Sequence, residues 1–342
     1  MKKILALSLA SAAALLSSTH AQNATTTPVG FVSVQLDANR RTAISIPLEN
    51  SPTAFGTVTG VTSTTITDAA ASFGSLVGSS YIKITSGQAA GRNFWITSNT
   101  ATVLTLRTGA ANFALPVDNS SGNTNNVAVG DKYQIVPMFT LAGIFGSNST
   151  SSVLKCAANP NQADQVTIYS DGTSAVYFND GINWRNALAG NDKNNYNALG
   201  ILPTSGIWIV RRATGANASL DFLGTVPIHG IKTQLPGGAR VAVGMPFPEG
   251  ATLATMSFSS MPGWVRGNNP ANSDQVTIYR PDNTSSVYFL DVNNVWRNAL
   301  AGNDKTNYAT TVIPPGSGIW VVRRGATTGV NATFAAILPY NL

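Results

Sequence analysis

Internal repetition constrains this chain more than any other feature of its sequence. The decapeptide Trp184–Lys193 recurs unchanged as Trp296–Lys305. The offset between matching segments grows only from 110 to 112 residues, because single residues enter two turns. Turns tolerate insertions that strands do not, so both copies are predicted to share one fold. Two further segments recur in the same order: Asp164–Tyr169 as Asp274–Tyr279, and Ser205–Arg212 as Ser317–Arg324.

The repeat extends upstream but is interrupted in the first copy. Arg41 and Pro47 match Arg240 and Pro246 at an offset of 199, whereas Thr140 matches Thr252 at an offset of 112. An insertion of about 87 residues in the first copy accounts for the difference. The predicted organisation is a signal peptide at 1–21, repeat unit A at 22–52 plus 138–226, an inserted module at 53–137 and repeat unit B at 227–342.

The apolar pattern predicts an all-β protein. Apolar residues alternate or run in short blocks between turn residues. No segment keeps a 3.6-residue apolar period over three helical turns. We expect two tandem copies of a β-sandwich or barrel-like unit, the first interrupted by a small β-barrel-like insert. The runs Ile207–Val210 and Ile319–Val322 are apolar on both faces and predict central strands covered from both sides.

One hairpin in unit A has a predicted buried face. Val166 and Ile168 alternate on one strand, and Asp171-Gly172 supplies a turn. We expect Val176 and Phe178 to continue the same buried face on the returning strand.

The N-terminus indicates export. Lys2 and Lys3 precede an apolar run from Ile4 to Leu16, and small residues end at Ala21, as in a secretory signal peptide. No later apolar run of 18 residues follows, so no membrane span is expected. The predicted location is extracellular, at the cell surface or in the periplasm.

Charge argues against a nucleic-acid partner. Only 11% of residues are charged, against roughly 25% in an average soluble domain. Removing residues 1–21 turns 21 basic and 15 acidic residues into 19 and 15, a net charge of +4. Arginines occur as isolated pairs and not in the Lys/Arg-rich runs that bind the phosphates of nucleic acids.

Groups with reactive chemistry are scarce. The predicted mature chain keeps one cysteine, Cys156, and one histidine, His229, which excludes an internal disulfide and zinc sites built from several Cys and His. Catalysis of the Ser/His/Asp type would need His229, which lies between the repeats. We identify no catalytic, cofactor-binding or metal-binding constellation and expect no enzyme activity. Acidic residues recur once per repeat, which favours turn or capping roles: Asp164 and Asp274, Asp180 and Asp291, Asp192 and Asp304.

A polar loop in each copy is the candidate ligand site. A Trp-Arg pair opens each loop and a Tyr closes it, so an aromatic ring could stack on a sugar beside polar side chains. Alternatively, both Trp side chains fill the hairpin core. The candidate ligand-binding residues are Trp184, Arg185, Asp192 and Tyr196 in the first copy, and Trp296, Arg297, Asp304 and Tyr308 in the second.

These motifs resemble known exported proteins. The series Ile44–Pro47, Asp164-Gln165, Trp184-Arg185 and Gly206–Trp208 resembles a tandem β-repeat of exported bacterial proteins of unknown function. The second copy departs from it at Val243–Pro246. The insert resembles a small β-module of phage structural and bacterial surface proteins, through the motifs Thr65–Asp68, Ile82–Gly87, Gly91-Arg92, Ile96–Ala101 and Gly130–Ile135. Neither resemblance brings a catalytic residue.

The expected function is therefore an exported, non-catalytic structural or adhesive protein of the cell surface, matrix or an appendage. Expected partners are polysaccharide, other surface proteins or further copies of the chain. One alternative is a carbohydrate-binding protein that uses the paired loops, and a less favoured one is a polysaccharide-active enzyme.

Overall fold

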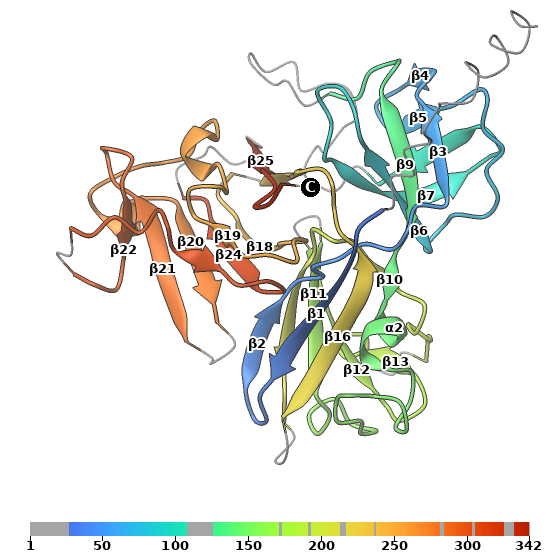
Figure 1. The fold of residues 1–342 in the computed structure, drawn as a ribbon. Helices are drawn as coiled ribbons and strands as arrows, with labels where there is room; N and C mark the ends of the chain where they lie inside the picture. The colour runs from blue at the N-terminus through green and yellow to red at the C-terminus, as the bar shows by residue number, and fades with distance from the viewer. Residues whose placement is uncertain are drawn as a thin grey trace, which may run out of the picture.

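A computed structural model describes residues 27–107, 126–170, 173–190, 193–212, 217–235, 237–280, 284–302, 305–324 and 332–341. It is nearly all β and divided among several sheets, as predicted (Figure 1). The proposed signal peptide at 1–21 and the turn Asp171-Gly172 lie outside the described residues.

Unit A is a two-layer sandwich. A five-stranded antiparallel sheet has the order β13-β12-β11-β15-β2. A two-stranded ribbon, β1 with β16, contributes Val34, Leu36 and Phe222 to the core shared with this sheet. The strands are β1 (Val29–Leu36), β2 (Arg41–Ile44), β11 (Gln165–Ser170), β12 (Thr173–Asn179), β13 (Trp184–Asn186), β15 (Gly206–Val210) and β16 (Ala218–Thr225).

Unit B repeats this arrangement strand for strand. Its five-stranded sheet has the order β18-β24-β20-β21-β22, and its ribbon pairs β17 with β25. Ile231, Leu235 and Phe334 of that ribbon lie in a second core. The strands are β17 (Ile231–Leu235), β18 (Arg240–Gly244), β20 (Gln275–Tyr279), β21 (Ser285–Leu290), β22 (Trp296–Asn298), β24 (Gly318–Val322) and β25 (Ala332–Ala336).

Short elements close one end of each core. In unit A these are the paired strands β10 and β14 and the one-turn helix α2, whereas unit B has the pair β19 and β23 and two 3-10 turns. Thr140 caps α2 by accepting a hydrogen bond from the Gly143 N–H. The bounds are β10 (Phe139–Thr140), α2 (Leu141–Phe145), β14 (Gly200–Ile201), β19 (Ala251–Thr252), η1 (Phe258–Ser260), η2 (Pro270–Asn272) and β23 (Val312–Ile313).

The insert forms one curled sheet with the order β3-β9-β6-β7-β8-β5-β4. Its two edge strands, β3 and β4, are neighbours in sequence, and the Val58 and Thr59 N–H groups between them bond to Asp131 and Thr67 carbonyls. One segment thus contacts both edges of the sheet, which leaves little exposed edge. The strands are β3 (Ala54–Thr57), β4 (Gly60–Val61), β5 (Thr65–Thr67), β6 (Ser80–Ile84), β7 (Asn93–Asn99), β8 (Val103–Leu106) and β9 (Lys132–Pro137).

The predicted face of the β11–β12 hairpin is wrong by one residue. Val166 pairs with Tyr177 and Ile168 with Ala175. Residues directly opposite each other share a face, so Tyr177 lies in the core with Val166, whereas Phe178 is buried, as predicted, but on the other face. A shift of one residue in the pairing register exchanges the two faces of a strand, and the turn of a hairpin sets that register.

The two units meet through reciprocal contacts. Tyr169 of unit A packs edge-on against Trp320 of unit B at 4.8 Å between ring centroids. Their counterparts, Tyr279 and Trp208, make the same contact at 4.9 Å. The Ser45 N–H bonds to the Gly316 carbonyl and its counterpart, the Gly244 N–H, to the Thr204 carbonyl. Equivalent residues thus contact each other both ways, as in a symmetric dimer.

This interface covers the outer faces of the central strands. β15 and β24 lie inside their sheets, as predicted from their apolar runs. Ile207 and Ile209 point into the unit A core, whereas half-buried Trp208 faces unit B. A Cβ on Gly206 would lie 2.4 Å from the Ala242 Cβ, so the backbones approach closely here.

We predict equal energetic coupling in the two aromatic pairs. A double-mutant cycle on Tyr169→Leu and Trp320→Leu should give about 1 kcal/mol of coupling in the free energy of unfolding. The cycle on Tyr279→Leu and Trp208→Leu should give the same value. Tyr177 faces the unit A core, so its cycle with Trp320 is the control, and coupling no larger than in that control would contradict the prediction.

Candidate functional site

The two indole rings of the candidate loops are buried. The Trp184 side chain is fully covered, its Nε1 donates to the Gly146 carbonyl at 2.7 Å, and its ring packs against Phe145. Trp296 is 3% exposed and packs against Phe258. Neither ring is open to a ligand, which corrects the interpretation that they stack on a sugar. Their large apolar surface fills the core instead.

Arg185 and Arg297 hold the loops that follow them. The Arg185 Nε lies 2.6 Å from the Asp180 Oδ2, and its guanidinium also donates to the carbonyls of Lys193 and Asn194. In unit B, the Arg297 Nε lies 2.9 Å from the Asp291 Oδ2. The Arg297 guanidinium donates to the carbonyls of Lys305 and Thr306. The planar guanidinium has several N–H donors, which lets each arginine bond to a carboxylate and to loop carbonyls at once. These arginines therefore fix the conformation of the loops.

The carboxylates of these ion pairs are held in the charged form. Burial alone would raise the pKa of Asp180, but hydrogen bonds from Arg185 and from the N–H groups of Asn183 and Ile182 bring it below its ordinary value. Burial would likewise raise the pKa of Asp291. Hydrogen bonds from the Val295 N–H and from Arg297 lower it below its ordinary value. A carboxyl with a lowered pKa makes a poor general acid at neutral pH.

The remaining loop residues form no shared site. Tyr196 packs against Tyr177 at 5.2 Å, and Tyr308 against Tyr288 at 5.5 Å. Asp192 and Asp304 lie outside the described residues. β13 and β22, which begin the two loops, are outer strands of different sheets and lie on opposite sides of Figure 1. The candidate residues that the structure describes therefore lie together within each copy and not across copies.

A second duplicated pair is deeply buried. Asp164 is 1% exposed; it accepts the N–H groups of Lys155 and Arg212 and lies 3.5 Å from the Arg211 Nε. The Arg211 guanidinium also donates to the Leu36 carbonyl at the end of β1.

Unit B contains the same arrangement. Asp274 accepts the N–H groups of Val265 and Arg324, and the Arg323 Nε lies 3.4 Å from its Oδ2. Arg323 donates to the Leu235 carbonyl at the end of β17. Each pair therefore joins its own ribbon to its own sheet, and Asp164 and Asp274 share no cleft.

We predict that Asp164→Asn and Asp274→Asn each destabilise the fold. Removing one partner of a buried ion pair leaves the other charge uncompensated, which costs about 3–5 kcal/mol. Equilibrium denaturation should show a similar loss for both variants. Asp221 on the exposed face of β16 is the matched control, and Asp221→Asn should change stability by less than about 0.5 kcal/mol. A loss in only one copy would contradict the equivalence of the two pairs.

A third buried pair joins the insert to unit A. The Lys83 Nζ on β6 lies 2.9 and 2.7 Å from the two carboxylate oxygens of Glu49. Their side chains are 2% and 6% exposed. The sequence analysis missed this pair. No signal in the sequence pointed to it, because the alternation of Ile82, Lys83 and Ile84 is that of a strand with the lysine on its solvent face.

His229 lies within the electrostatic reach of this pair. Burial lowers the pKa of His229, the positive charge of Lys83 lowers it further, and Glu49 acts in the opposite direction. His229, which lies between the repeats in sequence, is thus half-buried and interacts with charges of both the insert and unit A.

We predict that His229 contributes to the loss of stability in mild acid. Its folded-state pKa lies below the ordinary 6.5. The unfolded chain therefore binds a proton more readily, and the free energy of unfolding falls as pH drops below that value. Denaturation at a series of pH values should show a shallower fall for His229→Gln than for the wild type. Equal slopes between neutral and mildly acidic pH would contradict this assignment.

Other chemistry is limited within the described ranges. Cys156 is half-buried, and burial raises the pKa of its thiol. No group of three or more His, Cys, Asp or Glu side chains gathers there as metal ligands would. No helix in the same ranges is long and apolar enough to cross a bilayer.

No family model, curated protein or solved structure matches this chain. The likeness to exported bacterial β-repeat proteins therefore stays an expectation from the motifs.

Proposed function

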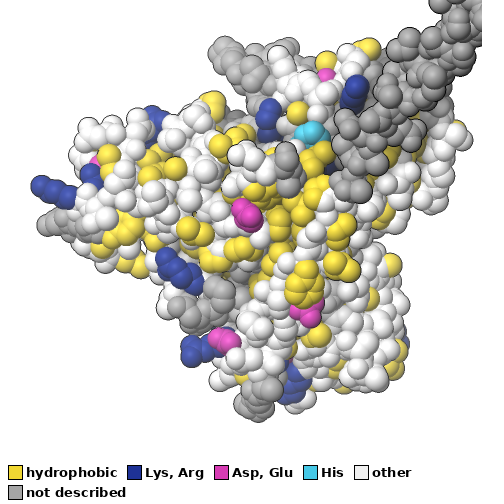
Figure 2. All heavy atoms as spheres, viewed as in Figure 1, with side chains coloured by type: hydrophobic (Ala, Val, Ile, Leu, Met, Phe, Trp, Pro, Cys, Tyr) yellow, Lys and Arg dark blue, Asp and Glu magenta, His cyan; other side chains and the backbone are white. Residues whose placement is uncertain are grey.

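We propose that this chain is an exported, non-catalytic structural or adhesive protein of the cell surface, matrix or an appendage. The outer face of the β1–β16 ribbon carries the argument. Phe31 and Leu223 are directly opposite each other and are 64% and 66% exposed, and neighbouring Val29 is 69% exposed. Figure 2 shows hydrophobic side chains gathered over this part of the molecule. Grouped apolar side chains in water favour contact with another molecule.

The fold itself does not need the Phe31 side chain. Further along the same face, Ser33 and Asp221 are exposed, as expected for the solvent side of a ribbon. The pairing registers match Leu36 and Ala218 of unit A to Leu235 and Ala332 of unit B, so Phe31 corresponds to Gly230 and Leu223 to Ile337. Ile337 is 57% exposed, so an exposed apolar residue stands at this position in both copies, whereas unit B forms its ribbon with glycine in place of Phe31. Phe31 is thus extra to folding, which supports a role in contact.

The rigid connection of the parts also suits a mechanical role. The reciprocal aromatic pairs join the two units, and the buried Glu49–Lys83 pair joins the insert to unit A. The duplicated carboxylates Asp164 and Asp274 are held by arginines inside their own units. These groups stabilise structure, and no turnover is expected when the purified protein is screened against polysaccharides.

Fractionation of producing cells with electron microscopy tests the proposal. We expect the full chain in a surface layer, matrix or filament, and expect Phe31→Ser with Leu223→Ser to release it as a soluble monomer. The unfolding temperature should stay within about 4 °C, because both side chains are exposed.

Phe55 is the matched control for this experiment. It is 70% exposed on β3 of the insert, away from the ribbon face. Phe55→Ser should leave the chain in its assembly. A wild-type chain found only as a soluble monomer, or equal release by Phe55→Ser, would overturn the proposed function.

A further inference from the structure

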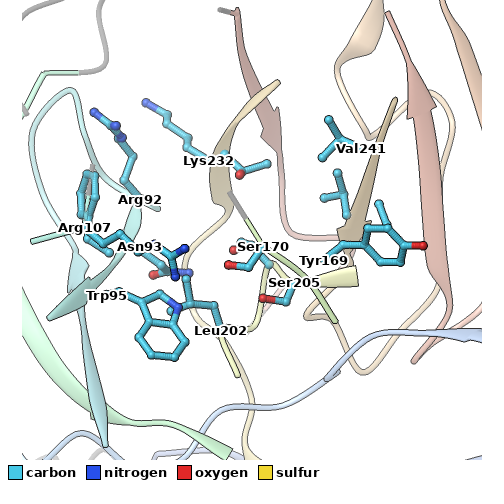
Figure 3. A pocket seen from close by; sticks show the side chains of 15 residues that line it. Arg92, Asn93, Trp95, Arg107, Tyr169, Ser170, Leu202, Ser205, Lys232 and Val241 are labelled. Atoms are coloured by element: carbon cyan, nitrogen blue, oxygen red, sulfur yellow. The ribbon is translucent and has the colours of Figure 1, made fainter. Parts of the chain in front are cut away.

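A small cavity lies where the insert, unit A and unit B meet. Arg92, Asn93, Trp95 and Arg107 line it from the insert (Figure 3). Its volume is about 50 Å³. A buried water needs roughly 10–15 Å³ measured in the same way, so the cavity holds a group of a few heavy atoms and not a whole sugar ring. Across from the insert, unit A contributes Tyr169, Ser170, Leu202 and Ser205, and unit B contributes Lys232 and Val241.

The cavity is lined by cations. Arg92, Arg107 and Lys232 all belong to its wall, whereas no Asp or Glu is found among the described residues that line it. Arg92 is 5% exposed and its guanidinium lies 4.5 Å from the centre of the Phe94 ring. Burial lowers the pKa of Arg92 to about 10, so the group stays charged at neutral pH. Burial, and then the charge of Arg92, lower the pKa of Lys232.

Backbone contacts keep two of these cations together. The Lys232 N–H bonds to the Gly91 carbonyl at 2.9 Å, and the Lys232 Nζ to the Gln88 carbonyl at 2.6 Å. Arg92 and Lys232 form a parallel bridge between β17 and the start of β7. Gly91 has a φ of +91°, and a Cβ there would lie 2.4 Å from the Gly230 carbonyl oxygen. Only glycine permits this approach, so the spacing of the charges is built into the docking of the insert.

Unpartnered polar atoms lie in the same wall. The Asn93 Nδ2 and Oδ1 and the Trp95 Nε1 are buried and make no hydrogen bond. They are three of the eight such atoms in the described part of the chain. Native proteins rarely leave buried polar atoms unpaired, so such a group calls for a ligand or water. Two N–H donors in a wall that also contains three cationic residues match an oxyanion, and the Asn93 oxygen can accept a bond from a hydroxyl.

We propose that this cavity binds the anionic group, a carboxylate or a sulfate, of an acidic polysaccharide. Arg92 and Lys232 attract the oxyanion, and a planar guanidinium can bind a carboxylate or sulfate through two parallel hydrogen bonds. The sugar ring stays outside the cavity, because a volume of about 50 Å³ does not hold one. This site is distinct from the β1–β16 ribbon and does not rest on the proposed adhesive role of that ribbon.

Calorimetric titration of the full chain with three polymers tests the proposal at one ionic strength. The probes are polygalacturonate, dextran sulfate and uncharged dextran. We expect binding of at least one anionic polymer and none of uncharged dextran, and the stronger of the two anionic ligands identifies the preferred group. Lys232→Gln and Arg107→Gln should each weaken that binding at least tenfold.

Two exposed cations outside the cavity are the matched controls. Lys132 lies on β9 of the insert and Arg240 on β18 of unit B. Lys132→Gln and Arg240→Gln should keep the affinity within twofold of the wild type. Equal weakening by these controls would show diffuse charge attraction, and binding of neither anionic polymer, or of dextran equally well, would also overturn the proposal.

Two further measurements separate folding and assembly from binding. The thermal unfolding temperature of each variant is measured first, and if Lys232→Gln does not fold, exposed Arg107 decides the outcome alone. Phe31→Ser with Leu223→Ser should retain polymer binding, whereas Arg107→Gln should retain assembly. Either proposal can therefore fail without the other.

Discussion

The central strands β15 and β24 are apolar on both faces, and each needs a cover on both. Within a unit, the ribbon and the short elements share a core with one face. The other face is covered only when the second unit packs against it, through Trp208 on Tyr279 and Trp320 on Tyr169. Burial of apolar surface is the main favourable term in folding, so neither unit is complete alone. The insert contacts both units, unit A through the Glu49–Lys83 pair and unit B through the Arg92–Lys232 bridge.

Buried charge shows the same dependence on tertiary contacts. Asp164 and Asp274 lie inside their units only because an arginine and two backbone N–H groups compensate each carboxylate. Lys83 is buried because Glu49 reaches it from unit A. In each case the charge is tolerated where its partner is fixed, and the pairs hold separate elements in register.

Comparison of the two copies separates the requirements of folding from those of function. Positions that agree, such as Trp184 with Trp296 or Arg185 with Arg297, fill the same core or hold the same loop. Positions that differ are where the proposed roles lie. Phe31 stands where unit B has Gly230, and Lys232 stands where unit A has Ser33. Because the repeat folds with either residue at these positions, folding does not require Phe31 or Lys232.

The sequence by itself determined the all-β class, the repetition and the central position of the two apolar strands, because these follow from local patterns and from similarity between segments. It did not determine the face of the β11–β12 hairpin, since that depends on the geometry of a turn. The burial of Trp184 and the cation-lined cavity were decided by tertiary structure. Arg92 and Lys232 are 140 residues apart in the chain and meet only because Gly91 lets the insert approach unit B. No local pattern encodes a contact between surfaces of separate modules.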